Sequence, residues 1–221
     1  MALVQLVDFE ESLHVREVDV SDIGIISHKD ADDLMREMQQ QRIKDEIQDT
    51  VVFCEHPEIV TIGPRARNDG ISAPLGYDSR PVDRGGGLTW HGPGQLVIYP
   101  IFKWDLEGES NVKAIISLLE DWVISSFADL GIVGGRDKRM QGVWIDDNKV
   151  CSIGLSFRRW TSRHGLTVNY NTPLGRVEFV NGCGLDAETT TSLNTLEIEV
   201  TREAIIESLL NNIKSIQRKI V

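Results

Sequence analysis

The sequence has 221 residues, of which 41% are apolar and 26% charged, and this composition is typical of one soluble globular domain spanning 1–221. Its 34 acidic and 23 basic residues give a net charge of −11, which disfavours non-specific nucleic-acid binding because the phosphate backbone would be repelled. No apolar run approaches the roughly 18 residues of a membrane-spanning helix, and acidic residues near Met1 argue against a signal or transit peptide. We therefore expect no nucleic-acid partner and no membrane partner.

Three segments have the pattern of amphipathic helices. Asp30–Ile47 is polar with a loose apolar stripe, whereas Val112–Leu130 repeats its apolar residues at the 3,4 spacing of a buried face. Ser110 or Asn111 can cap the start of that helix. The third helix is predicted over Arg202–Lys219, with Thr201 as its N-cap.

Short apolar runs between turn signals predict strands. A hairpin turn is expected at 146–149 and a long loop at 65–83, where Gly, Pro, Asn and Ser are frequent. Consecutive hairpins with few helices between them predict an α+β fold, with a mixed or mostly antiparallel sheet flanked by helices. The predicted strands are Val51–Cys54, Ile59–Ile62, Leu96–Ile101, Val143–Ile145, Val150–Phe157 and Leu166–Tyr170.

Three cysteines, Cys54, Cys151 and Cys183, are widely spaced and form no CxxC pair, so zinc and a disulfide framework lack support. A reducing cytoplasm is the natural interpretation. Cys54 and Cys151 lie in apolar runs and are expected to be buried. Glycines flank Cys183 on both sides, which fits either a thiol presented to a ligand or a small residue packed in a turn.

The segment Arg84–Gln95 holds five glycines in twelve residues, a pattern that allows sharp turns or close approach of the backbone to a ligand. It has neither the P-loop spacing nor a dinucleotide-binding fingerprint. His91 in this segment and the more distant His164 could act as a base or have a structural role.

Charge along the chain is uneven. From Arg136 to Arg163 there are seven basic and three acidic residues, a net charge of +4 in an acidic protein. This segment is either a docking surface for an acidic partner or an ordinary solvated face. Lys149, beside Asp146 and Asp147, has the pattern of a solvated turn lysine.

Taken together, these segments resemble the lipoyl(octanoyl) transferase family. Arg84–Gln95 is similar to the family pattern Arg-Gly-Gly, two variable residues, Thr-aromatic-His-Gly-Pro-Gly-Gln. The segment 149–154 is similar to the family pattern Lys-(Ile/Val)-x-(Ser/Ala)-(Ile/Leu)-Gly. Further matches are His56-Pro57, Thr61–Gly63, Arg158-Arg159, His164–Asn169, Gly182–Gly184 and Thr191–Leu193. Gly182 stands where the family usually has Pro, Pro64 where Arg is common, and Gly87 where Gln is frequent.

The resemblance implies the fold of biotin and lipoate ligases. It also implies transfer of an octanoyl group from acyl carrier protein to a lysine of lipoyl domains, the first step of endogenous protein lipoylation, with no cofactor and no metal. The acceptors would be the lipoyl domains of 2-oxoacid dehydrogenase complexes and the glycine cleavage carrier protein.

By the same resemblance Cys183 is the nucleophile and Lys149 activates it, either as a base or by its charge. The substrate-binding residues implied are Arg84, Gly85, Gly86, Gly87, Leu88, Thr89, Trp90, His91, Ser152, Ile153, Gly154, Gly165, Leu166 and Thr167. Two other functions are possible: an ATP-dependent lipoate–protein ligase of the same fold, and a noncatalytic carrier-binding protein.

Overall fold

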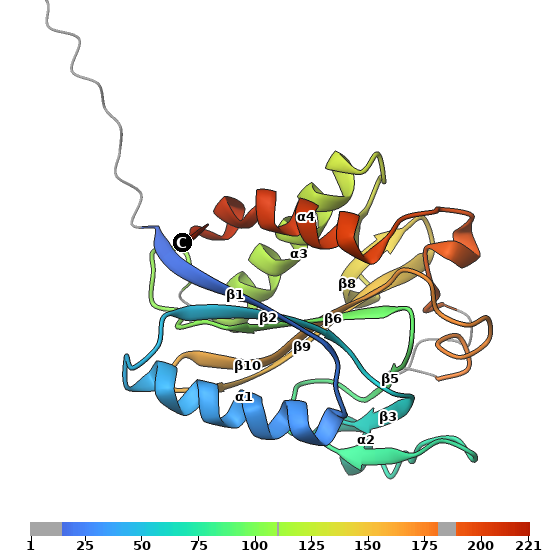
Figure 1. Ribbon diagram of the computed structural model, residues 1–221. Helices are drawn as coiled ribbons and strands as arrows, with labels where there is room; N and C mark the ends of the chain where they lie inside the picture. The colour runs from blue at the N-terminus through green and yellow to red at the C-terminus, as the bar shows by residue number, and fades with distance from the viewer. Residues whose placement is uncertain (1–14, 110, 181–188) are drawn as a thin grey trace, which may run out of the picture.

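A computed structural model describes residues 15–109, 111–180 and 189–221, and its centre is an eight-stranded mixed sheet (Figure 1). The two strand pairs at one edge, β11–β1 and β1–β2, are parallel, and every later pair in the sheet is antiparallel. In order across the sheet the strands are β11 (Arg218–Ile220), β1 (Arg16–Ile25), β2 (Asp49–Glu55), β6 (Gln95–Ile101), β10 (Thr161–Asn169), β9 (Asn148–Arg158), β8 (Met140–Ile145) and β7 (Gly135–Asp137).

Helices cover both faces of this sheet (Figure 1). On one face lie α3 (Val112–Asp129) and α4 (Arg202–Asn211), and on the other lies α1 (His28–Ile43). Successive side chains along each strand point alternately into the two cores. Phe53 and Ile98 face the larger core with α3, whereas Cys54 and Val97 face α1. The sheet is therefore buried on both sides, which explains the continuous apolar runs in its strands.

A second, smaller sheet lies beside the first and has the order β4-β3-β5. Its strands are β3 (Ile59–Ile62), β4 (Ser79–Pro81) and β5 (Leu88–His91), and the short helix α2 (Pro64–Asn68) follows β3. Val60, Leu88 and Trp90 form a third apolar cluster with Val177 and Val180. This cluster packs the glycine-rich segment, at Leu88 and Trp90, against Val177 and Val180.

The predicted fold class, α+β with a mixed sheet flanked by helices, is confirmed. The helix expected at Val112 is present and Asn111 caps it, because its side chain accepts a hydrogen bond from the Ala114 amide. Cys54 and Cys151 are fully buried as expected, and burial raises the pKa of each thiol to about 12. None of the described helices is long and apolar enough to cross a membrane.

Several predicted boundaries were wrong. The helix expected over Asp30–Ile47 spans His28–Ile43, and the strand expected over Leu166–Tyr170 spans Thr161–Asn169. The segment 65–83 is not one loop, since it contains most of α2 and all of β4. The third helix ends at Asn211 instead of Lys219: a 3-10 turn, η2 (Ile213–Ile216), follows it, and the chain then enters β11. Ile213 and Ile216 extend the apolar spacing because i and i+3 also share a face in a 3-10 helix.

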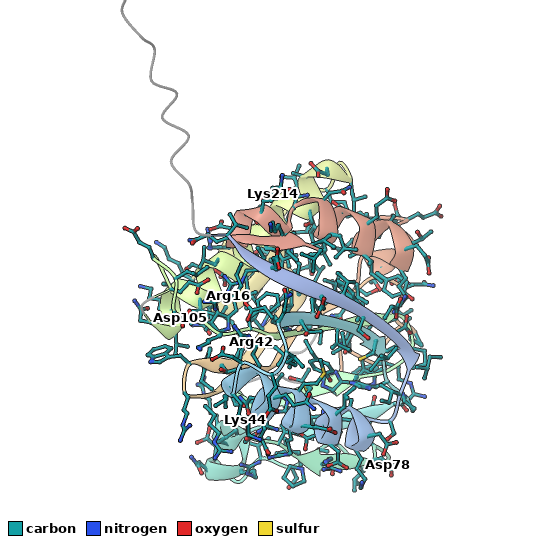
Figure 2. All side chains as sticks on the ribbon, turned by 60° about the vertical axis from the view of Figure 1, so that its left-hand side comes forward. Arg16, Arg42, Lys44, Asp78, Asp105 and Lys214 are labelled. Carbon is teal, nitrogen blue, oxygen red and sulfur yellow. The ribbon has the colours of Figure 1, made fainter. Side chains whose placement is uncertain are left out.

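A buried charge cluster explains why the chain leaves the helix there. Arg218 has no exposed surface and its side chain pairs with Asp49 of β2 at 3.0 Å and with Glu109. Asp49 also accepts a hydrogen bond from Arg42 at 2.7 Å, and Arg16 lies 3.9 Å from it; both arginines are labelled in Figure 2. The cluster pins β11 to the edge of the sheet.

Candidate active site

A cavity of about 90 Å³ lies where the glycine-rich segment crosses β9 and β10. Lys149 lines it, together with all fourteen residues that the family resemblance assigned to substrate binding: Arg84, Gly85, Gly86, Gly87, Leu88, Thr89, Trp90, His91, Ser152, Ile153, Gly154, Gly165, Leu166 and Thr167. Their roles stay predictions, although the structure brings them together. Cys183 lies outside the described residues.

Several other residues of the cavity wall were not among the substrate-binding residues predicted from the sequence. Three of them could have been found by period-two alternation in β6, since Gln95, Val97 and Tyr99 face the same side. The others are spread along the chain and follow no single sequence pattern: His28, Met140, Asn169, Val177, Val180 and Thr190. Within the described part of the chain, His28 Nδ1 and Thr167 Oγ1 are buried without a hydrogen-bond partner, so both can serve a bound ligand.

The Arg84 side chain holds the start of the glycine-rich segment 84–95, hereafter the glycine loop, through hydrogen bonds to its backbone. Its guanidinium donates to Thr61 Oγ1 at 2.8 Å, to the Gly85 carbonyl at 3.0 Å and to the Gly87 carbonyl at 3.1 Å. The loop then rests on β9, where the Gly85 amide donates to the Leu155 carbonyl at 2.9 Å. Contact this close requires glycine, because a Cβ on Gly154 would lie 2.9 Å from the Gly85 carbonyl oxygen.

His91 is held as a neutral, hydrogen-bonded ring. Its Nδ1 lies 2.8 Å from Gln95 Oε1 and its Nε2 lies 3.2 Å from Thr61 Oγ1. Burial holds the pKa of His91 well below its usual value, and the neighbouring His56 and His28 rings, 5.6 Å away, act in the same direction. These contacts favour the structural role among the two that the sequence left open.

His164 is likewise buried, and burial lowers its pKa. Its Nε2 donates to Asp83 Oδ1 at 2.8 Å, and Asp83 also accepts from Arg163. The resulting charges hold the pKa of Asp83 far below its usual value, with the His164 hydrogen bond as the largest cause. Asp83 precedes Arg84, so this cluster anchors the start of the glycine loop to β10.

Lys149 is not the solvated turn lysine that its local sequence suggests. It lies near the start of β9 with 4% of its surface exposed. Its backbone amide donates to the Thr189 carbonyl at 2.8 Å, and its carbonyl accepts from the Thr191 amide at 2.9 Å. The chain after the 181–188 segment therefore lies directly against Lys149.

The basic segment is a poorer docking surface than its charge count indicates. Arg163 is 4% exposed and donates to Asp32 of α1 at 2.7 Å, so it is not available to a partner. Arg136 pairs with Glu120 at 2.7 Å, and Arg139 pairs with Asp137 at 2.8 Å. Of the basic residues from 136 to 163, those left exposed without an ion pair to the described residues are Lys138, Arg158 and Arg159.

Comparison with known proteins agrees with this geometry. The family model of the lipoyl protein ligase A/B catalytic domain matches residues 29–214. The chain belongs to this family. Its curated relatives include an octanoyltransferase of Caldanaerobacter subterraneus subsp. tengcongensis, 31% identical over 211 residues and covering 91% of each chain. An octanoyltransferase of Syntrophobacter fumaroxidans is 34% identical over 188 residues, or 82% of each chain. The family resemblance and the expected enzyme class, a transferase, are thereby confirmed.

Solved structures confirm the expected fold. A bi-partite lipoate protein ligase from Thermoplasma acidophilum matches with a TM-score of 0.66 at 13% identity, covering 93% of this chain and 86% of that one. A biotin protein ligase from Aquifex aeolicus matches with a TM-score of 0.52 at 10% identity, covering 91% and 69%.

Proposed function

We propose that this enzyme moves an octanoyl group from octanoyl-acyl carrier protein to a lysine of a lipoyl domain, through a thioester on Cys183. The observation that carries the proposal is a buried lysine, Lys149, in the wall of a cavity lined by every family-motif position assigned to substrate. The octanoyltransferases among its relatives support the same activity.

The chemistry balances in two steps. The Cys183 thiolate attacks the donor thioester, the acyl–sulfur bond of the donor breaks, and the carrier leaves as a thiol after taking a proton. The acceptor lysine amine then attacks the acyl-cysteine, an amide forms, and the cysteine thiol is regenerated with the proton that the amine loses. One thioester replaces another and an amide is the final product, so no step requires ATP.

In these two reaction steps Lys149 would either accept and return a proton or stabilise the Cys183 thiolate by its positive charge. An unperturbed lysine has a pKa of about 10.4, and burial in an apolar site disfavours its charged form. An uncharged amine can accept the proton of a thiol or of the acceptor amine, whereas a charged one can only stabilise a thiolate.

Described residues on both sides of the 181–188 segment support Cys183 as the proposed nucleophile, because Val180 and Thr190 both line the cavity. The acceptors we propose are the lipoyl domains named above, and the compartment we propose is the cytoplasm.

Intact mass measurement tests the proposal. Mixing the enzyme with octanoyl-carrier protein without ATP should add one octanoyl group, which hydroxylamine removes. Cys183→Ala should abolish the adduct, whereas Cys54→Ser and Cys151→Ser should keep it. Pyrophosphate release that depends on ATP would instead identify a ligase, and an adduct that persists in Cys183→Ala would overturn the assignment of the nucleophile.

A further inference from the structure

The side chain of Lys149 passes over a glycine of the neighbouring strand. Gly142 of β8 is buried, and a Cβ built on it would lie 2.6 Å from Lys149 Cε and 2.1 Å from the Cys151 carbonyl oxygen. Both distances are shorter than any normal van der Waals contact. A side chain at position 142 and the present position of the Lys149 side chain therefore exclude each other.

The backbone at this point departs from a regular strand. Gly142 has φ +132°, a region that favours glycine, and the register between β8 and β9 shifts just after it, between Val143 and Trp144. Such an irregularity leaves a backbone group outside the regular ladder, and that group needs another partner when it is buried.

The hydrogen-bond partner of the Gly142 amide is a buried carboxylate of α3, the helix that packs on this face of the sheet. Glu120, in the middle of α3, is 5% exposed, and its Oε1 accepts a hydrogen bond from the Gly142 amide at 2.9 Å. Its Oε2 accepts from Arg136 Nε at 2.7 Å, which fixes the orientation of the carboxylate. A carboxylate in an otherwise apolar helix face is costly to bury unless its charge is paired, so this placement is a specific feature of the core.

We infer that Glu120 and Gly142 together form a positioning device for Lys149: Glu120 holds the irregular backbone of β8, and the space left at Gly142 accommodates the lysine side chain. The inference rests on the proposed function, in which Lys149 acts on the transferring acyl group. Neither residue is proposed to touch substrate.

Gly142→Ala tests the device directly. The added methyl would clash with the Cys151 carbonyl oxygen as well as with Lys149 Cε, so β8 must shift relative to β9 and the Lys149 side chain is displaced with it. A misplacement of about 1 Å can lower the rate about 100-fold. We expect kcat to fall on that scale while KM for the octanoyl donor changes little. The matched control is Gly135→Ala on β7, where an added Cβ meets no atom within 4 Å and should leave kcat unchanged.

Glu120 is tested by a pair of variants. Glu120→Gln keeps an oxygen that can accept from the Gly142 amide and should retain most of kcat, whereas Glu120→Leu removes the acceptor and should lower kcat on the order of tenfold. A residue that only stabilises the fold would affect thermal stability in both variants without separating them in this way. Should Gly142→Ala fail to fold, the comparison of these two variants still decides the inference.

A readout independent of turnover is the rate at which an acylating reagent modifies the Lys149 amine, followed by mass spectrometry. We expect slow modification in the wild type and in Gly135→Ala, and faster modification in Gly142→Ala and Glu120→Leu, accompanied by a shifted pH profile of kcat. If all variants match the wild type in kcat, pH profile and Lys149 labelling, the inference is wrong. If the wild type forms no octanoyl adduct, the proposed function fails, and the labelling rates still test the positioning.

Discussion

Arg163 of β10 and Asp32 of α1 form a buried ion pair with an Nη1–Oδ1 distance of 2.7 Å, which joins the helix to the strand that forms one wall of the cavity. Asp32 also accepts from Arg36 at 3.2 Å, and Arg163 reaches Asp83 at the start of the glycine loop. One guanidinium thus connects α1, β10 and the loop over the cavity.

Removing Arg163 should therefore destabilise the fold. Arg163→Ala leaves the buried Asp32 carboxylate with weaker partners, and breaking a buried pair costs about 3–5 kcal/mol. We expect a loss of about 3 kcal/mol in the free energy of unfolding, measured by urea titration. Arg159→Ala is the control: Arg159 is exposed and should change stability by about 0.5 kcal/mol or less. Equal stability of the two variants would contradict the structural role of Arg163.

Stability should fall in acid because buried histidines cannot be protonated in the folded state. Burial lowers the pKa of His28 from 6.5 to about 3, with His56 and His164 adding to the effect. Between about pH 3 and 6.5 the unfolded chain binds this proton and the folded chain does not, so stability is lost as the pH falls through that window. The slope is about 1.4 kcal/mol per pH unit for one such group.

The variant His28→Gln isolates this contribution. Unfolding free energies measured by urea at several pH values should show a slope about 1.4 kcal/mol per pH unit shallower than that of the wild type between pH 4 and 6. Parallel curves for the two proteins would show that His28 is protonated equally in both states.

Gly154→Ala should weaken substrate binding more than stability. The new Cβ would lie 2.9 Å from the Gly85 carbonyl oxygen and 3.1 Å from Arg84 Cδ, so the glycine loop must move away from β9. Overpacking of this kind costs about 1–3 kcal/mol. We expect KM for the octanoyl donor to rise about tenfold, which corresponds to about 1.4 kcal/mol, with kcat less affected. Ser156→Ala, two residues along the same strand, is the control, and the same KM in both variants would refute the prediction.

Salt should have a smaller effect on transfer than the charge of the basic segment suggests. Because Arg163 is buried and Arg136 and Arg139 are paired, steering of an acidic carrier would fall to Lys138, Arg158 and Arg159. A triple change of these residues to Gln should raise KM at low ionic strength and leave KM unchanged at high ionic strength. If KM is unaffected at both ionic strengths, these three residues do not form a docking surface for the carrier.

The elements found from sequence are those whose pattern is local. The helix α3 has an uninterrupted apolar stripe, whereas β1 was missed because only Val18 in it is fully buried. The cavity residues were found through the family motif. The burial of Lys149 could be inferred only through that motif and not from its local sequence, because it depends on backbone pairing with Thr189–Thr191, about 40 residues away in sequence. The burial of Arg163 and Arg218 could not be predicted for the same reason, because their carboxylate partners Asp32 and Asp49 lie 131 and 169 residues away in sequence.

The pairing of β11 with β1 also has a kinetic consequence. Arg16 is opposite Arg218, so this ladder joins segments about 200 residues apart, and closing so large a loop costs entropy before any contact of the ladder forms. The antiparallel hairpin β9–β10, by contrast, closes over two residues between Arg158 and Thr161. Hydrogen exchange during refolding should therefore protect the amides of β9 and β10 well before those of β1 and β11.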